Sequence, residues 1–403
     1  MLLLEVLCGV VLGFVLGLIP NIHINLIGYV FSLFGVFVFF KENFYFFFSL
    51  CVSQTLTSII PSFIFYTQTQ DVLFSPFLGQ TPATPSETKA LLLLSFLSFL
   101  LGGIFSVLFL PFFYLLFLLF SDFYFLIFLI LLLSLIFLIF QEKENSFRLI
   151  VLAIIIFSGT LGVFTLKFNF FFKEPLIPCV FGLFALPSIL LILFSEDGGS
   201  KKEETDSDSK SVQEIMCFKQ IVYLSFLGTL FSSTIAIFPS LSPGLAMTFA
   251  NTFKENKSSK ETVVLFSSIL SSVLLIYFFL AVVFNKSRIG FISFLQINNI
   301  LPKVVFADVL QLAFVFLIVV GLTVTLAYFC LDSIFIELNK LDKKTVLFFV
   351  LMFSLFIVFV FSGMGGLFLV VVSGGIGFLP IVYNKNRLAL MSYLILPTIL
   401  FFV

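Results

Sequence analysis

The sequence predicts an all-α integral membrane protein, and two observations lead to this fold class. Of the 403 residues, 61% are hydrophobic and 10% are charged, whereas soluble domains carry roughly a quarter charged residues. Apolar runs of about 17 to 25 residues recur along the chain between short charged or Pro/Gly-rich segments, a length that suits membrane-spanning helices. We therefore expect a polytopic, multi-pass protein of the cell membrane with roughly 12 transmembrane or re-entrant helices.

The apolar runs define the expected helices. The first run, MLLLEVLCGVVLGFVLGLI, lacks a basic n-region and a small-residue cleavage site, so we interpret it as a helix and not as a signal peptide. The run at 90–120 is long enough to tilt or break. The expected segments are, in order, 3–19, 26–40, 43–66, 90–120, 122–140, 149–167, 175–195, 219–238, 244–253, 262–284, 304–331, 345–361, 366–382 and 388–402.

The chain shows signs of an internal duplication around a hydrophilic linker. The stretch SEDGGSKKEETDSDSKSVQ cannot bury enough apolar surface to fold. We expect a first membrane repeat over 1–195, a linker over 196–218 and a second membrane repeat over 219–403. Three motif pairs recur in the same order: LIPNIHIN (18–25) and IFPSLSPG (237–244), SGTLG (158–162) and SGMGG (362–366), GLFALP (182–187) and GIGFLP (375–380). Both inverted and parallel repeats are compatible with this pattern.

Charge and cysteine content exclude several functions. Lysine plus arginine and aspartate plus glutamate number 21 each, so no net field favours nucleic acid. The five cysteines are scattered without CxxC pairs, which supports neither a disulfide framework nor a metal cluster, and the identity of any bound metal stays open. Lysines and arginines between apolar runs, among them Lys286 and Arg288, are candidate cytoplasmic anchors.

The first polar break holds the only histidine of the chain. Pro20 removes a backbone donor, so the preceding helix should end there and leave carbonyl groups exposed. Asn21, His23 and Asn25 follow, and a new helix starting near Asn25 would direct its N-terminal N–H groups into the gap. Such a helix start can bind an anion.

The second break repeats this design with hydroxyl groups. Its residues are Pro239, Ser240, Ser242, Pro243 and Gly244. A proline kink whose polar neighbours cap the backbone would explain one isolated break. Recurrence in both halves favours a binding site, because paired helix breaks in repeated membrane units point to the substrate site of a transporter.

The third apolar run carries Ser53, Gln54 and Thr55. Such residues can bond carbonyls of their own or neighbouring helices, or they can line a polar path. We predict that they line the site. No catalytic residues are predicted, because the single histidine leaves no nucleophile and base pair and the spacing of zinc proteases is absent.

These motifs together resemble a known family. GLIPNIHIN, SQTLTSIIPSF, SGTLG with GLFALPSIL, IFPSLSPG, and GIGFLPIVYNKNRLALMSYLILP resemble, in order, landmarks of the large permease subunit of tripartite tricarboxylate transporters, the TctA family, and especially its shorter archaeal-type branch. The resemblance implies cation-coupled uptake of carboxylates such as citrate. It also implies a small membrane subunit and a periplasmic binding protein as partners, although archaeal-type members look like stand-alone permeases.

The family signature falls on both breaks, with departures. It covers Pro20 to Asn25 and Pro239 to Gly244, but Asn21 and Ser240 stand where the signature has glycine, and Ile24 stands where it has proline. Glycine lets a backbone approach a ligand closely, so these departures bear on the substrate.

The sequence thus predicts a secondary transporter that moves a small organic anion, a di- or tricarboxylate, coupled to Na⁺ or H⁺ and without another cofactor. Membrane lipid is its expected surrounding. The predicted site comprises Asn21, His23, Asn25, Ser53, Gln54, Thr55, Ser240, Ser242 and Gly244, with helix breaks at Pro20, Pro239 and Pro243. Two alternatives are a non-transporting membrane assembly subunit, in which the breaks are packing features, and a lipid-acting membrane enzyme, which would need a carboxylate facing a lateral opening.

Overall fold

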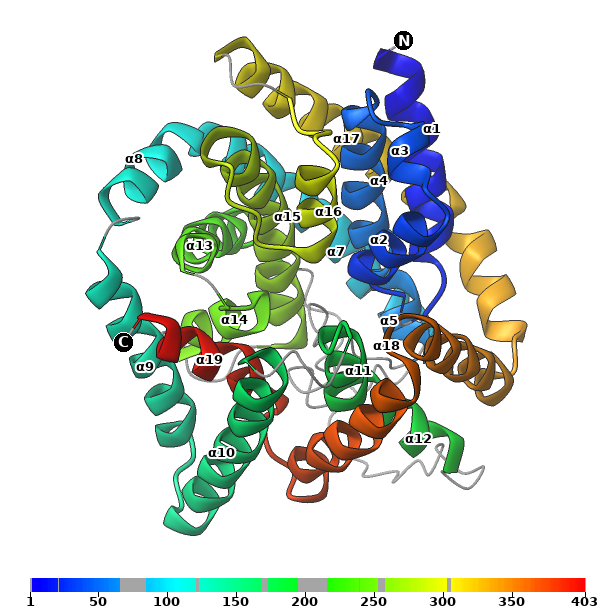
Figure 1. The fold of residues 1–403 in the computed structure, drawn as a ribbon. Helices are drawn as coiled ribbons and strands as arrows, with labels where there is room; N and C mark the ends of the chain where they lie inside the picture. Colours follow the sequence, from blue (N-terminus) through cyan, green and yellow to red (C-terminus); the bar gives the residue numbers. More distant parts are fainter. Residues whose placement is uncertain are drawn as a thin grey trace.

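The fold is a bundle of helices, as predicted. The computed structural model describes residues 2–20, 22–65, 85–120, 123–167, 173–194, 216–238, 240–252, 258–302 and 306–402, and no strand occurs within these ranges. Figure 1 shows helices from both halves of the chain gathered into one body. The prediction of an all-α protein is confirmed.

The helices of the first half follow the predicted apolar runs. They are α1 (Leu2–Gly17), α2 (Ile24–Leu33), α3 (Val36–Phe39), α4 (Phe44–Thr57), α5 (Ile59–Phe65), α7 (Pro85–Leu108), α8 (Leu110–Phe120), α9 (Tyr124–Phe140), α10 (Asn145–Lys167), α11 (Leu176–Val180), the π-helical turn η1 (Phe181–Ala185) and α12 (Leu186–Phe194). The long run at 90–120 divides at Phe109 into α7 and α8.

The helices of the second half begin after the linker. They are α13 (Phe218–Ile237), α14 (Pro243–Thr252), α15 (Ser259–Phe284), α16 (Gly290–Ile297), α17 (Phe306–Lys340), α18 (Lys343–Val382), the 3₁₀ turn η2 (Arg387–Met391) and α19 (Ser392–Phe402). Two expected segments, 345–361 and 366–382, join into α18, which bends at Gly363 with φ 63°. Most of the predicted linker, 196–215, lies outside the described residues.

Many of these helices can cross a membrane. Seven described segments are long and apolar enough, or eight if α8 and α9, which meet at 105°, count as one bent span. Three shorter apolar segments, α1, α2 and η2–α19, accompany them. The multi-pass character predicted from the sequence is confirmed.

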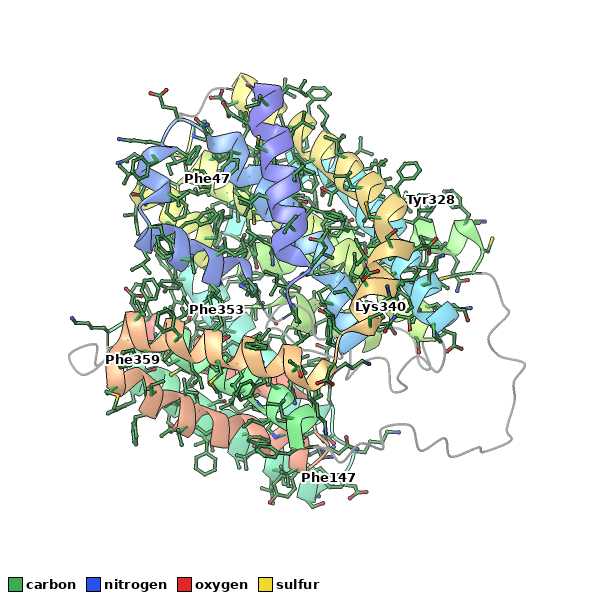
Figure 2. The ribbon with its side chains drawn as sticks, turned by 90° about the vertical axis from the view of Figure 1, so that its right-hand side faces the viewer. Phe47, Phe147, Tyr328, Lys340, Phe353 and Phe359 are labelled. Atoms are coloured by element: carbon green, nitrogen blue, oxygen red, sulfur yellow. The ribbon has the colours of Figure 1, made fainter. Side chains whose placement is uncertain are left out.

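The centre of the bundle is built from α15 and α4. The most apolar window of α15 is completely buried, and that of α4 with α5 is 89% buried. In contrast, α17 and α18 carry exposed aromatic side chains, such as Tyr328 and Phe359, on their outer faces (Figure 2). This distribution is expected where lipid replaces water as the outer solvent.

Small residues bring the central helices together. A Cβ atom on Gly13 of α1 would lie 2.4 Å from the carbonyl oxygen of Leu50 in α4. Across the same contact, the hydroxyl of Ser53 donates to the carbonyl of Val10 at 2.8 Å. Around α15, Ser268 lies against Gly102 of α7 and Gly228 of α13. Close backbone approach through small residues is the usual way in which helices associate in lipid.

Gly13→Ala should destabilise the fold, because the new methyl group would overlap the α4 backbone. Overpacking of this kind costs about 1–3 kcal/mol. The matched control is Gly321→Ala in α17, where an added Cβ would meet nothing within 4 Å. The measurement is the temperature at which detergent-purified protein loses its monodisperse chromatographic peak. Equal behaviour of the two variants would contradict the α1–α4 packing.

Candidate functional site

The first break separates α1 from α2, as predicted. Helix α1 ends at Gly17, Pro20 is buried, and α2 starts at Ile24. His23 caps α2, because its Nδ1 atom accepts the backbone N–H of Asn25 at 3.1 Å. An imidazole nitrogen that accepts carries no hydrogen, so a neutral His23 ring has its hydrogen on Nε2. Asn21 lies outside the described residues.

Two amide side chains hold the first break in place. The Nε2 atom of Gln54, from α4, donates to the carbonyl of Ile22 at 2.8 Å. The Oδ1 atom of Asn25 accepts the backbone N–H of Phe291 at 3.0 Å. Since Phe291 is in the first turn of α16, Asn25 links the break of the first half to a helix start in the second half.

The second break has the same construction. Helix α13 ends at Ile237, and α14 starts at Pro243, a favoured first helical residue because it needs no N–H partner. The Ser242 hydroxyl accepts the N–H of Leu245 at 3.4 Å. Gly244 is buried within the first turn of α14, and Pro239 lies outside the described residues.

Ser240 takes the backbone conformation that glycine favours. Its φ is 66°, in the left-handed region, and its hydroxyl bonds Thr398 of α19. The family signature has glycine at this position, so the structure gives a backbone reason for that glycine. In this chain the bond to Thr398 helps to hold a serine there.

Both breaks line one pocket of about 460 Å³. The first half contributes His23 and Asn25, and the second half contributes Ser240, Ser242 and Pro243. These residues are more than 200 positions apart in the sequence, and only the fold brings them together. A pocket of this volume is in the usual range for small-molecule sites.

Of the three residues of α4 that were predicted to line the site, one lines the pocket and two bond neighbouring segments. Thr55 lines the pocket. Ser53 instead bonds the backbone of α1, and Gln54 bonds the first break, so both shape the pocket from behind its wall. Gly244 also lies behind the wall, in the first turn of α14.

The pocket contains polar groups that the sequence analysis did not assign to it. Arg288, interpreted above as a candidate cytoplasmic anchor, lies in the wall between α15 and α16, and Tyr277 of α15 interacts with it electrostatically. Arg288 is the one lysine or arginine among the described lining residues, and none of these residues is acidic. The pocket is therefore suited to an anion. A basic residue two positions before the helix start at Gly290 was the available signal in the sequence.

Tyr29 of α2 lines the pocket. Its hydroxyl donates to the carboxylate of Glu174 at 3.1 Å, and the Ser362 hydroxyl donates to the backbone carbonyl of Glu174 at 3.1 Å. Glu174 precedes α11, and Ser362 precedes the bend of α18. The wall is thus tied to helices of both halves.

Much of the remaining lining is apolar. The apolar wall comes from α11, η1, α15, α18 and α19, and its side chains include Val180, Phe181, Val273, Val358 and Leu394. Ser354 of α18 also lines the pocket.

A multi-pass helical protein with two broken helices at one central pocket has the architecture of a membrane transport protein. The chain belongs to the tripartite tricarboxylate transporter TctA family, whose model matches residues 3–392. The resemblance inferred from the motifs is therefore confirmed, and the protein is a permease of the membrane. No curated protein and no solved structure matches the chain.

Gln54→Leu should destabilise the first break, because the carbonyl of Ile22 would lose its donor in an apolar setting. An unsatisfied buried polar group costs about 1–3 kcal/mol. The control is Ser62→Ala, which removes a hydroxyl bonded at 2.7 Å to Ser58, a residue one turn earlier. The measurement is the temperature at which the detergent-solubilised protein unfolds. Gln54→Leu should lower this temperature clearly, and Ser62→Ala should lower it little. A smaller effect of Gln54→Leu would show that this bond does not support the break.

Proposed function

We propose that the protein is a secondary active transporter that moves a small organic anion across the membrane, coupled to Na⁺ or H⁺, and that the pocket is its substrate site. The family description suggests a tricarboxylate as the cargo, and a dicarboxylate has the same kind of charged group. The observation that carries the proposal is the meeting of both breaks with Arg288 in one pocket.

The chemistry of the pocket supports anion binding. A guanidinium group donates charge-assisted hydrogen bonds to a carboxylate, and the helix starts at Ile24 and Pro243 add N–H groups and the positive ends of helix dipoles. Backbone carbonyls at the broken helix ends are the groups that bind Na⁺ in transporters of this architecture. The site residues in this proposal are His23, Asn25, Thr55, Ser240, Ser242 and Arg288, and Asn21 belongs to it by its position in the first break.

Two observations support alternating access between two repeats. Each half places a broken helix, α1–α2 or α13–α14, against a buried central helix, α4 or α15. The matching motifs GLFALP and GIGFLP also pack against each other, since a Cβ atom on Gly377 would lie 2.5 Å from the carbonyl oxygen of Leu183. In transporters built from repeats, alternating access is largely a rocking of one repeat against the other around the site.

The proposal extends to partners. The family is described as tripartite, so a small membrane subunit and a substrate-binding protein are its candidate partners. Transport by the purified permease alone would show that this chain works without them.

The test is uptake into proteoliposomes. Radiolabelled citrate, succinate, hexanoate, an amino acid and an uncharged control are offered under an imposed Na⁺ or H⁺ gradient. We expect gradient-driven accumulation of an organic anion. At substrate concentrations below saturation, Arg288→Ala should lower this uptake about tenfold or more, because a hydrogen bond to a charged group contributes about 1.5–3 kcal/mol. Uptake by Arg288→Lys should lie between that of the wild type and that of Arg288→Ala, since lysine keeps the positive charge but lacks the planar guanidinium group.

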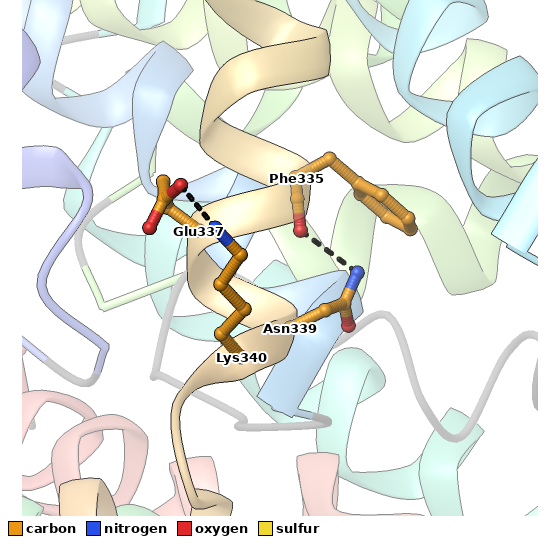
Figure 3. Close-up of polar contacts among 4 residues, drawn as sticks. All are labelled: Phe335, Glu337, Asn339 and Lys340. Atoms are coloured by element: carbon orange, nitrogen blue, oxygen red, sulfur yellow. Dashed lines mark hydrogen bonds and ion pairs between the residues drawn. The ribbon is translucent and has the colours of Figure 1, made fainter.

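Lys340→Ala is the matched control, since it removes one positive charge outside the described lining of the pocket. Lys340 is exposed near the end of α17 and pairs with Glu337 at 2.6 Å, beside the bond of Asn339 to the carbonyl of Phe335 (Figure 3). Exposed pairs contribute about 0–1 kcal/mol, so uptake should be unchanged.

Two outcomes would contradict the proposal. Folded, correctly oriented wild-type protein that accumulates nothing would favour a non-transporting assembly subunit. Turnover of lipid that depends on Glu87, Asp308 or Asp332 would favour a membrane enzyme; Asp332 forms an ion pair with Lys89, and both side chains are largely exposed.

A further inference from the structure

We infer that the preferred ligand of the pocket is a monoanion, one carboxylate on an apolar body, and not a tricarboxylate. This inference rests on the proposed function and narrows its substrate class. It follows from two properties of the described lining: its charge and its apolar wall.

The charge of the pocket matches one carboxylate. Arg288 is the one lysine or arginine of the described lining, and none of the described lining residues is acidic. The other polar lining groups are neutral amides and hydroxyls, such as Asn25, Ser242 and Tyr277, together with His23. A buried carboxylate needs a partner charge or several donors, because its desolvation costs several kcal/mol.

Several polar groups are already engaged in holding the protein together. Asn25 accepts the N–H of Phe291, the His23 ring accepts the N–H of Asn25, and Ser240 bonds Thr398. These bonds orient the polar side chains at both breaks.

The apolar wall would contact the rest of the ligand. It extends over α11, η1, α15, α18 and α19, and it includes Leu270 and Val273 of α15 as well as Phe181 and Val358. Citrate has carboxylate or hydroxyl groups along its whole length, so its charged groups would lie against this apolar wall. A hydrocarbon or aromatic body would bury apolar surface there, and each methylene would add to the binding free energy.

The test is ligand binding by calorimetry to the full-length protein in nanodiscs, in a Na⁺ buffer at pH 7, with empty nanodiscs as the partition control. The probes are acetate, butyrate and hexanoate, the multiply charged succinate and citrate, and the uncharged hexanamide. Sodium is present throughout, so that citrate can bind with a co-bound cation if the site provides one.

We expect affinity to rise about fourfold for each added methylene from acetate to hexanoate. Citrate, succinate and hexanamide should bind at least tenfold more weakly than hexanoate. Arg288→Ala should abolish the preference for hexanoate over hexanamide. Val358→Thr keeps the side-chain shape and replaces a methyl group of the apolar wall with a hydroxyl. It should weaken the binding of hexanoate severalfold and leave the binding of acetate unchanged.

Val371→Thr, at an exposed position of the same helix α18, is the matched control and should bind like the wild type. Tighter binding of citrate or succinate than hexanoate would overturn the monoanion inference while the transporter proposal stands. Binding of no probe, together with no uptake in proteoliposomes, would overturn both. Hexanoate binding equal to that of empty nanodiscs would also overturn the inference.

Discussion

The rest of this structure depends on one constraint: a backbone that leaves helical geometry inside a membrane must still bond its N–H and C=O groups. Each break meets this constraint with side chains. Gln54 bonds the carbonyl of Ile22, His23 caps α2, and Ser242 caps α14. Because these partners come from neighbouring helices as well as from the break itself, satisfying the backbone also positions the walls of the pocket.

Close helix packing makes these bonds possible. Gly13 lets α1 lie directly against α4, and this contact brings Gln54 within reach of the first break. Around the second central helix, Ser268 of α15 lies against Gly102 of α7 and Gly228 of α13. Small residues therefore have an indirect effect on the site, because they set the distance at which the polar side chains of the central helices meet the unwound segments.

The site combines family architecture with features of this chain. The chain belongs to the TctA family, and two helix breaks meet at its pocket, where Ser240 has a positive φ of the kind that glycine favours. The pairing of Arg288 with an apolar wall belongs to the lining of this particular pocket. Family membership shows the transport class, whereas under the proposed function the substrate depends on the side chains that line the pocket.

The sequence by itself determined the membrane location, the helical class, the family and the positions of both breaks, because hydropathy, proline and short motifs act locally along the chain. Only the tertiary structure decided which residues share the pocket. Gln54 faces the break because of how α4 packs on α1, and Arg288 enters the wall because Asn25 binds the start of α16. Such contacts join residues far apart in sequence, and no local pattern encodes their geometry.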